Sequence, residues 1–76
     1  MSKKMWNLKY VVGNPAMFSR VTSCADNPME RRKALEAAEM LAGHGWRVWV
    51  ESVNEPTRRI FESEVEKTHR SAAVTN

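Results

Sequence analysis

GWRVWVES, residues 45–52, has the alternation of side chains that is typical of a β-strand. Successive residues of a strand point to opposite faces of its sheet. The two tryptophans of this stretch lie three residues apart, at Trp46 and Trp49, so they cannot share a face. Trp46 falls with Val48 and Val50, which we expect to face a covering helix, and Trp49 then points to the other side of the sheet.

The preceding segment, NPMERRKALEAAEMLAG at residues 27–43, predicts an amphipathic helix. Asn27 is expected as the N-cap, with Pro28 in the first helical position and Glu30 reaching back as in a capping box. The helix is expected to end at Gly43, which suits the left-handed conformation after a helix. Most of its apolar stripe is alanine, so it can approach a sheet closely. The stripe comprises Ala34, Leu35, Ala38, Leu41 and Ala42.

Strands are expected on both sides of this helix. After it, residues 46–52 and 58–63 are separated by the turn-forming sequence VNEPT and predict a hairpin. Before it, residues 6–12 and 16–24 flank the turn-forming sequence GNP and predict a second hairpin. The pattern therefore predicts a small α+β domain of the type ββαββ, with one helix packed on a four-stranded, mainly antiparallel sheet. It leaves the strand order open.

The C-terminal part of the chain offers one more element. SEVE, residues 63–66, has the form of a capping box and predicts an optional short helix through Arg70. We expect a single domain over residues 1–70 and a disordered tail over residues 71–76.

Length and composition bound the class of protein. A chain of 76 residues has room for one small core, so a protein partner or a second copy would help to stabilise it. Its single cysteine, Cys24, cannot form an internal disulfide, and neither a signal peptide nor an apolar run of membrane-spanning length is found. We therefore expect a cytoplasmic protein that does not insert into a membrane.

The basic character lies in the first half of the chain. Residues 1–33 carry seven Lys or Arg against two acids, a net charge of +5. Residues 34–76 carry five against seven, a net charge of −2, which recovers the total of +3. Such a balance is compatible with nucleic acid or another anionic partner, although solubility alone also requires a net charge.

The position expected for Trp49 predicts a mixed aromatic and basic patch on the open face of the sheet. Depending on the register, Trp49 and Arg47 would meet one of two pairs from neighbouring strands: Phe18 with Arg20, or Phe61 with Arg59. Such a patch could stack the bases of nucleic acid while its arginines neutralise phosphates. It could also bind a protein, including a second copy. Alternatively, the terminal segments cover it and Trp49 belongs to a second small core.

A second candidate is the run of Arg31, Arg32 and Lys33 near the start of the helix. Cations in the first turn oppose the helix dipole, at a cost of about 0.3 to 1 kcal/mol each. Helix N-termini with nearby arginines bind phosphate or carboxylate well. The structural alternative is that Arg32 and Lys33 pair with Glu36 on a solvated face.

Catalytic and metal-binding patterns are not evident. Cys24, Asp26, His44 and His69 show no spacing typical of metal ligands, and no phosphate-binding or nucleophile motif is present. We therefore expect no enzyme activity, no metal and no cofactor.

Taken together, the sequence predicts a small interaction module that acts through protein–protein contacts at the open sheet face, with a protein or a second copy as partner. The alternative is a nucleic-acid-binding protein. The residues expected to bind in one role or the other are Trp49, Arg47, Arg20, Phe18, Arg31, Arg32 and Lys33.

Overall fold

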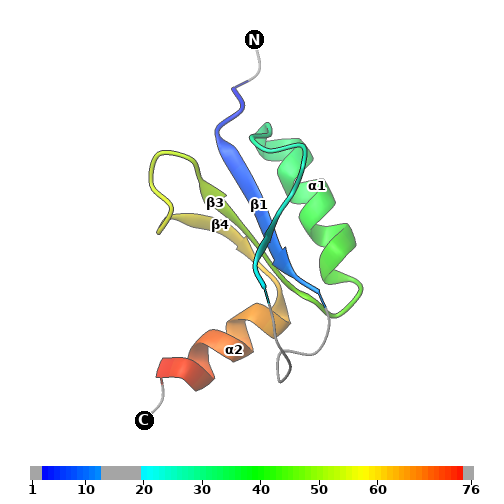
Figure 1. Cartoon of the computed structure of the whole chain (residues 1–76), viewed down its shortest axis with the longest axis vertical. Coiled ribbons are helices and arrows are strands. Elements are labelled where there is room, and N and C mark those ends of the chain that lie inside the picture. Colours follow the sequence, from blue (N-terminus) through cyan, green and yellow to red (C-terminus); the bar gives the residue numbers. More distant parts are fainter. Residues whose placement is uncertain (1–2, 13–19, 75–76) are drawn as a thin grey trace.

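The computed structural model describes residues 3–12 and 20–74. The elements follow the order ββαββα (Figure 1). They are β1 (Trp6–Val11), β2 (Thr22–Ser23), α1 (Arg31–Ala42), β3 (Arg47–Ser52), β4 (Arg59–Glu62) and α2 (Glu64–Val74).

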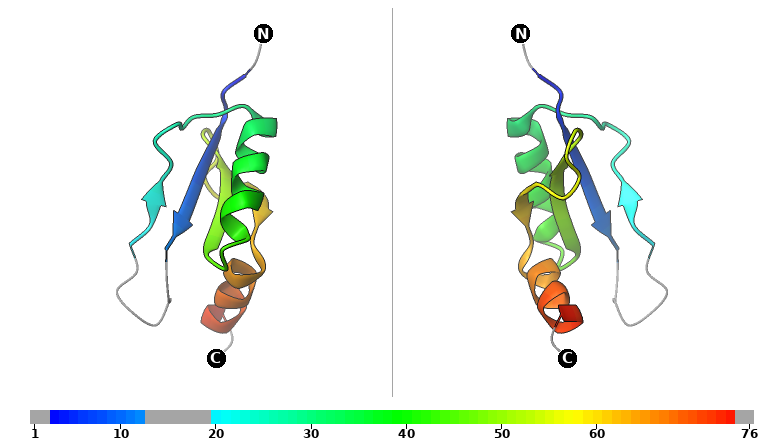
Figure 2. Two further views of the ribbon diagram at one scale, coloured as in Figure 1. Left: turned by 90° about the vertical axis from the view of Figure 1, so that its right-hand side faces the viewer. Right: turned by 90° about the vertical axis from the view of Figure 1, so that its left-hand side faces the viewer.

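The described strands form one antiparallel sheet in the order β2-β1-β3-β4. The strand pairs of both predicted hairpins are present, although the predicted GNP turn, residues 13–15, lies outside the described residues. The inner strands β1 and β3 pair with each other in the centre of the sheet. Helix α1 lies against one face of the sheet, whereas α2 extends beyond its end (Figures 1 and 2). The predicted α+β fold is confirmed.

The core lies between α1 and the two central strands. Leu8, Val48 and Val50 of the sheet and Ala34 and Ala38 of the helix are fully buried there. The alanines let the helix backbone approach the valines closely, as the sequence predicts.

Trp46 lies at the margin of this core, on the α1 side of the sheet as expected. Its ring stacks on Tyr10 at a centroid distance of 6.1 Å and contacts His44 at 4.8 Å. The large ring therefore covers one end of the core, and the alanines of α1 pack on the smaller valines.

The start of α1 differs from the prediction. The helix begins at Arg31, its N-cap is Glu30, and no side chain caps it. The amide of Asn27, expected to be the cap, instead accepts a hydrogen bond from the Leu8 backbone N–H and donates one to the Leu8 C=O, both at 2.9 Å. Met29 also pairs with Trp6 by two backbone hydrogen bonds, of 3.1 and 2.7 Å. The predicted capping box is wrong because these residues run in extended form beside β1.

The end of α1 also differs in detail. Gly43 has a right-handed conformation (φ −62°), and the left-handed residue is Gly45 (φ 83°). The backbone N–H groups of His44 and Gly45 bond to the carbonyls of Leu41 and Ala42, at 3.0 and 2.9 Å. These bonds continue the turn past Gly43, so the chain reverses direction two residues later than predicted.

The optional C-terminal helix forms. Ser63 Oγ accepts the backbone N–H of Glu66 at 3.2 Å, as in the predicted capping box, although the Glu66 side chain is used elsewhere. Helix α2 continues to Val74, so residues 71–74, expected in the disordered tail, belong to the helix. Of the predicted return strand over residues 16–24, only Thr22–Ser23 is a strand, and residues 16–19 lie outside the described residues.

The side chain of Asn27 gives a first test. We expect Asn27→Ala to lower the free energy of unfolding by about 1 to 3 kcal/mol, because it removes two hydrogen bonds from the backbone of a central strand. Urea denaturation measures this change. Asn54→Ala, at an exposed position of the β3–β4 turn, is the control and should have little effect. Equal stabilities of the two variants would contradict the role assigned to Asn27.

Candidate interaction surfaces

Trp49 occupies the sheet face opposite α1, but it is only 4% exposed. The guanidinium groups of Arg59 and Arg47 lie 4.5 and 5.7 Å from the centre of its ring. Its Nε1–H donates a hydrogen bond of 2.9 Å to Glu51. Trp49 therefore does not offer the exposed aromatic surface that the sequence predicts, because charged side chains of the same face cover it.

These side chains belong to a network centred on Glu66. The Glu66 carboxylate is 1% exposed and lies between two arginines, with Oε1 at 2.7 Å from Arg47 Nε and Oε2 at 2.8 Å from Arg59 Nη1. Arg59 also pairs with Glu62 at 2.9 Å, and Glu62 pairs with Arg70 of α2. The network therefore connects β3, β4 and α2.

The arginines determine the charge state of Glu66. Burial by itself would raise the pKa of this carboxyl, but hydrogen bonds from Arg47 and Arg59, together with their positive charges, outweigh that effect. The pKa of Glu66 is therefore lowered, and the side chain is ionised in the folded protein at neutral pH.

Among the other residues predicted to accompany Trp49, two that the structure describes, Phe61 and Arg20, lie elsewhere. Phe61 pairs with Val50 and packs against the core on the α1 side. Arg20 is exposed just before β2, and Phe18 lies outside the described residues. Of the predicted neighbours within the described residues, Arg47 and Arg59 contact Trp49.

The cations at the start of α1 are exposed, as expected for a surface that binds an anion or for a solvated helix face. Arg32 pairs with Glu36 at 3.4 Å, which confirms that part of the structural alternative. A hollow of about 330 Å³ lies beside them. It is lined by Lys4, Asp26, Pro28, Met29, Glu30 and Lys33.

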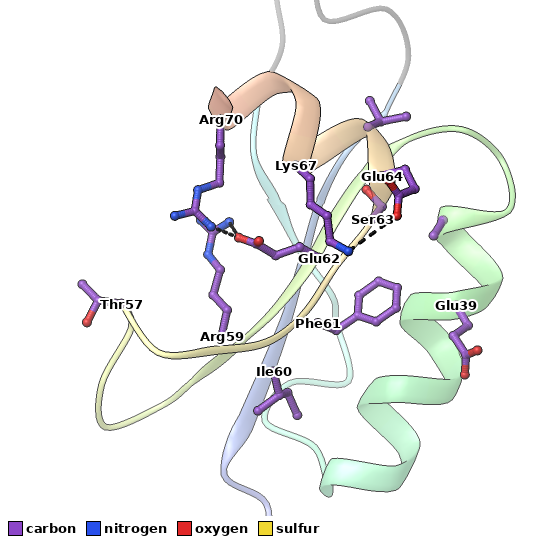
Figure 3. A pocket seen from close by; sticks show the side chains of 12 residues that line it. Glu39, Thr57, Arg59, Ile60, Phe61, Glu62, Ser63, Glu64, Lys67 and Arg70 are labelled. Carbon is purple, nitrogen blue, oxygen red and sulfur yellow. Dashed lines mark hydrogen bonds and ion pairs between the residues drawn. The ribbon is translucent and has the colours of Figure 1, made fainter. Parts of the chain in front are cut away.

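A larger groove, of about 800 Å³, runs along β4 between α1 and α2 (Figure 3). Phe61 and Ile60 of β4 are half-buried in it, and Phe61 points toward α1. Glu39 of α1 lines one side, and the side chains of α2 line the other. Those of α2 that reach the groove are Glu64, Val65, Lys67 and Arg70.

β4 is an edge strand, so one side of its backbone faces this groove. The Ser63 N–H bonds to the Val48 carbonyl at 2.8 Å, and Phe61 is paired with Val50. Because hydrogen-bonded pairs alternate along an antiparallel ladder, Glu62 directs its N–H and C=O away from β3. The register shifts next to this pair, and Ile60 has no partner on β3. This site was not predicted, because a pattern of strands in a sequence does not reveal which strand lies at the edge of the sheet.

Two classes of site are absent from the part of the chain that the structure describes. No group of three or more His, Cys, Asp or Glu side chains is placed to hold a metal ion in residues 3–12 and 20–74. Across the same residues, no helix has the length and apolar character needed to cross a membrane.

The buried carboxylate provides a second test. We expect Glu66→Gln to lower the free energy of unfolding by about 2 to 3 kcal/mol, because it leaves the largely buried Arg47 without its counter-charge and removes one of the two carboxylates that pair with Arg59. Glu64→Gln is the matched control on the same helix, with a side chain that is 90% exposed, and should change stability by less than about 0.5 kcal/mol. Urea denaturation of both variants is the measurement.

The pH dependence of the effect of Glu66→Gln tests the lowered pKa of Glu66. A carboxyl whose pKa is lower in the folded than in the unfolded chain stabilises the fold above its ordinary pKa of 4.5, and this contribution is lost as the pH falls through the folded value. The stability difference between Glu66→Gln and wild type should therefore be constant between about pH 5 and 7 and shrink on further acidification. A difference that grows in acid would contradict the assignment.

No protein-family model matches the chain, and the searches of curated proteins and of solved structures found no significant match.

Proposed function

We propose that this chain is a small, non-enzymatic interaction module that binds a protein segment in the groove along the free edge of β4. The observation that carries the proposal is a backbone edge that lies inside a groove with an apolar floor. An extended segment can add to such an edge through backbone hydrogen bonds, while the surrounding side chains select its sequence.

The groove has the parts that strand addition requires. Glu62 presents an unpaired N–H and C=O, and the half-buried Ile60, Phe61 and Val65 offer apolar contacts. Helices α1 and α2 form the two walls (Figure 3). A bound segment would therefore lie between the helices and extend the sheet by one strand.

The groove supports protein contacts better than the sheet face around Trp49 does. On that face, Arg47 and Arg59 form ion pairs with Glu66. Glu51 pairs with Lys9 and accepts a hydrogen bond from Trp49. A ligand would therefore have to displace existing ion pairs. Displacing a buried ion pair leaves an uncompensated charge and costs several kcal/mol. We therefore assign the interaction to the groove instead of the open face.

The charged groups of the groove suit binding more than catalysis. Glu62 is paired with both Arg59 and Arg70, and Glu64 is paired with Lys67. Paired carboxylates set the orientation of a bound chain through charge complementarity. The single cysteine, Cys24, fits a protein that works in a reducing compartment, and we propose the cytoplasm.

A selection from random short peptides displayed on phage tests the proposal. We expect peptides that bind the wild-type protein at micromolar concentrations, shift the amide NMR signals of β4 and slow the hydrogen exchange of the Glu62 amide, because that N–H becomes part of a new ladder. Ile60→Lys should weaken their binding by about tenfold or more, because it places a charge in the apolar floor.

Val21→Lys is the matched control, since it makes a similar change at an exposed residue beside β2, on the opposite edge of the sheet. Amide spectra establish that both variants are folded. Peptides that bind without protecting Glu62, or that lose equal affinity in both variants, would contradict strand addition at β4.

A second candidate function, nucleic-acid binding, is favoured by the start of α1. Arg31, Arg32 and Lys33 are exposed there, the helix N-terminus has no side-chain cap, and its first turn contains no acid. Phosphates would meet both the free N–H groups and the cations.

Fluorescence anisotropy with a mixed-sequence single-stranded oligonucleotide tests this candidate. We expect binding that weakens steeply with salt, and Arg31→Ala/Lys33→Ala should reduce the slope of log K against log[salt] by about 1 to 2. Arg58→Ala/Lys67→Ala removes two exposed cations elsewhere and controls for net charge. An equal loss in both double variants would mean that overall charge, not the start of α1, attracts the oligonucleotide.

A further inference from the structure

We infer that the partner in the β4 groove is a second copy of this chain, whose own β4 adds antiparallel across a two-fold axis. This inference rests on the proposed function, since it names the occupant of the same groove. The two sheets would become one continuous sheet with the two β4 strands at its centre.

The charge of the groove favours self-association. A two-fold interface places a surface against itself, so an excess of either charge would repel the second copy. The chain as a whole carries a net charge of +3. The groove lining instead carries three cations and three acids, and its net charge is zero. These are Arg59, Lys67 and Arg70 against Glu39, Glu62 and Glu64.

The register of such a dimer follows from the free backbone groups. With the two-fold axis at Phe61, Glu62 of each copy lies opposite Ile60 of the other. The N–H and C=O of Glu62 point away from its neighbour Trp49 on β3, and Ile60 has no partner on β3. The two Phe61 side chains then meet on the α1 side as a directly opposed cross-strand pair. The apolar floor of the groove therefore becomes the centre of the interface.

The balance of charge in the lining can be tested at Glu64. Its side chain is 90% exposed, its partner Lys67 lies at 3.5 Å, and both residues line the groove. Because two-fold symmetry places the lining of one copy against that of the other, a charge reversed at Glu64 enters the interface twice.

The small core means that a dimer would add to the stability of the fold. The described residues include eight buried apolar residues, and two of these are alanines. A core of this size stabilises a lone domain by only about 3 to 5 kcal/mol. Burying the half-exposed floor of the groove against a second copy adds apolar area without any change in the fold.

Analytical ultracentrifugation over a dilution series tests the dimer. We expect the mass to rise from 8.7 kDa toward twice that value with micromolar Kd. Glu64→Lys should weaken the dimer by about tenfold or more at low salt, because it gives each of the two facing grooves a net charge of +2 in place of zero. The double variant Glu64→Lys/Lys67→Glu returns the lining to zero net charge and should restore the dimer.

Glu36→Lys is the control for net charge. It makes the same change at another exposed helical position and likewise breaks one surface ion pair, but it lies outside the groove. Equal effects of Glu64→Lys and Glu36→Lys, or no rescue by the double variant, would overturn a dimer formed through the groove.

The dimer and the proposed function fail in different ways. A chain that stays at 8.7 kDa at every concentration, while selected peptides still protect the Glu62 amide, would overturn the dimer and leave strand addition in place. A chain that neither dimerises nor binds peptides at β4 would overturn both the dimer and strand addition. A peptide that dissociates the dimer while it protects Glu62 supports both.

Discussion

The carboxylate of Glu66, held between Arg47 and Arg59, is the interaction on which the second half of the structure depends. The two arginines come from β3 and β4, and the carboxylate comes from α2. A buried carboxylate is tolerated only where both oxygens find partners, so α2 has little freedom to move along the sheet. The same arginines lie over Trp49, and one ion-pair arrangement thus covers the tryptophan and positions the helix.

Polar contacts at the start of α2 act together with this arrangement. Ser63 is buried and its Oγ accepts the N–H groups of Val48 and Glu66 while it donates to the carbonyl of Trp46. Helix α2 is therefore attached to the sheet largely by hydrogen bonds and ion pairs. Because α2 forms one wall of the groove along β4, the shape of the groove depends on these polar contacts more than on apolar packing.

The sequence predicted the parts of the fold that depend on local periodicity. The alternation of β3 placed Val48 and Val50 toward α1, and the helical stripe identified Ala34 and Ala38 as the facing residues. The environment of Trp49 could not be predicted in this way, because it depends on Arg59 and Glu66, which are brought to it by the β3–β4 register and the path of α2.

The start of α1 shows how a local signal can be overridden. Asn27, Pro28 and Glu30 match a capping box, but the Asn27 amide satisfies two backbone groups of Leu8 on a neighbouring segment. A cap satisfies one backbone N–H, whereas this side chain satisfies an N–H and a C=O together. Similarly, the groove was not predicted because its existence depends on β4 being at the edge of the sheet, and strand order is a property of the whole chain.

The uneven charge of the chain corresponds to two separate surfaces. All the residues that line the groove lie between residues 39 and 70, within the half of the chain whose net charge is −2. The exposed cations at the start of α1 belong to the half whose net charge is +5. A protein segment in the groove and an anion at the start of α1 would therefore contact different residues, and neither would remove the other's ligands. The positive charge that attracts an anion thus lies outside the neutral groove. The same charge inside the groove would oppose the approach of a second copy.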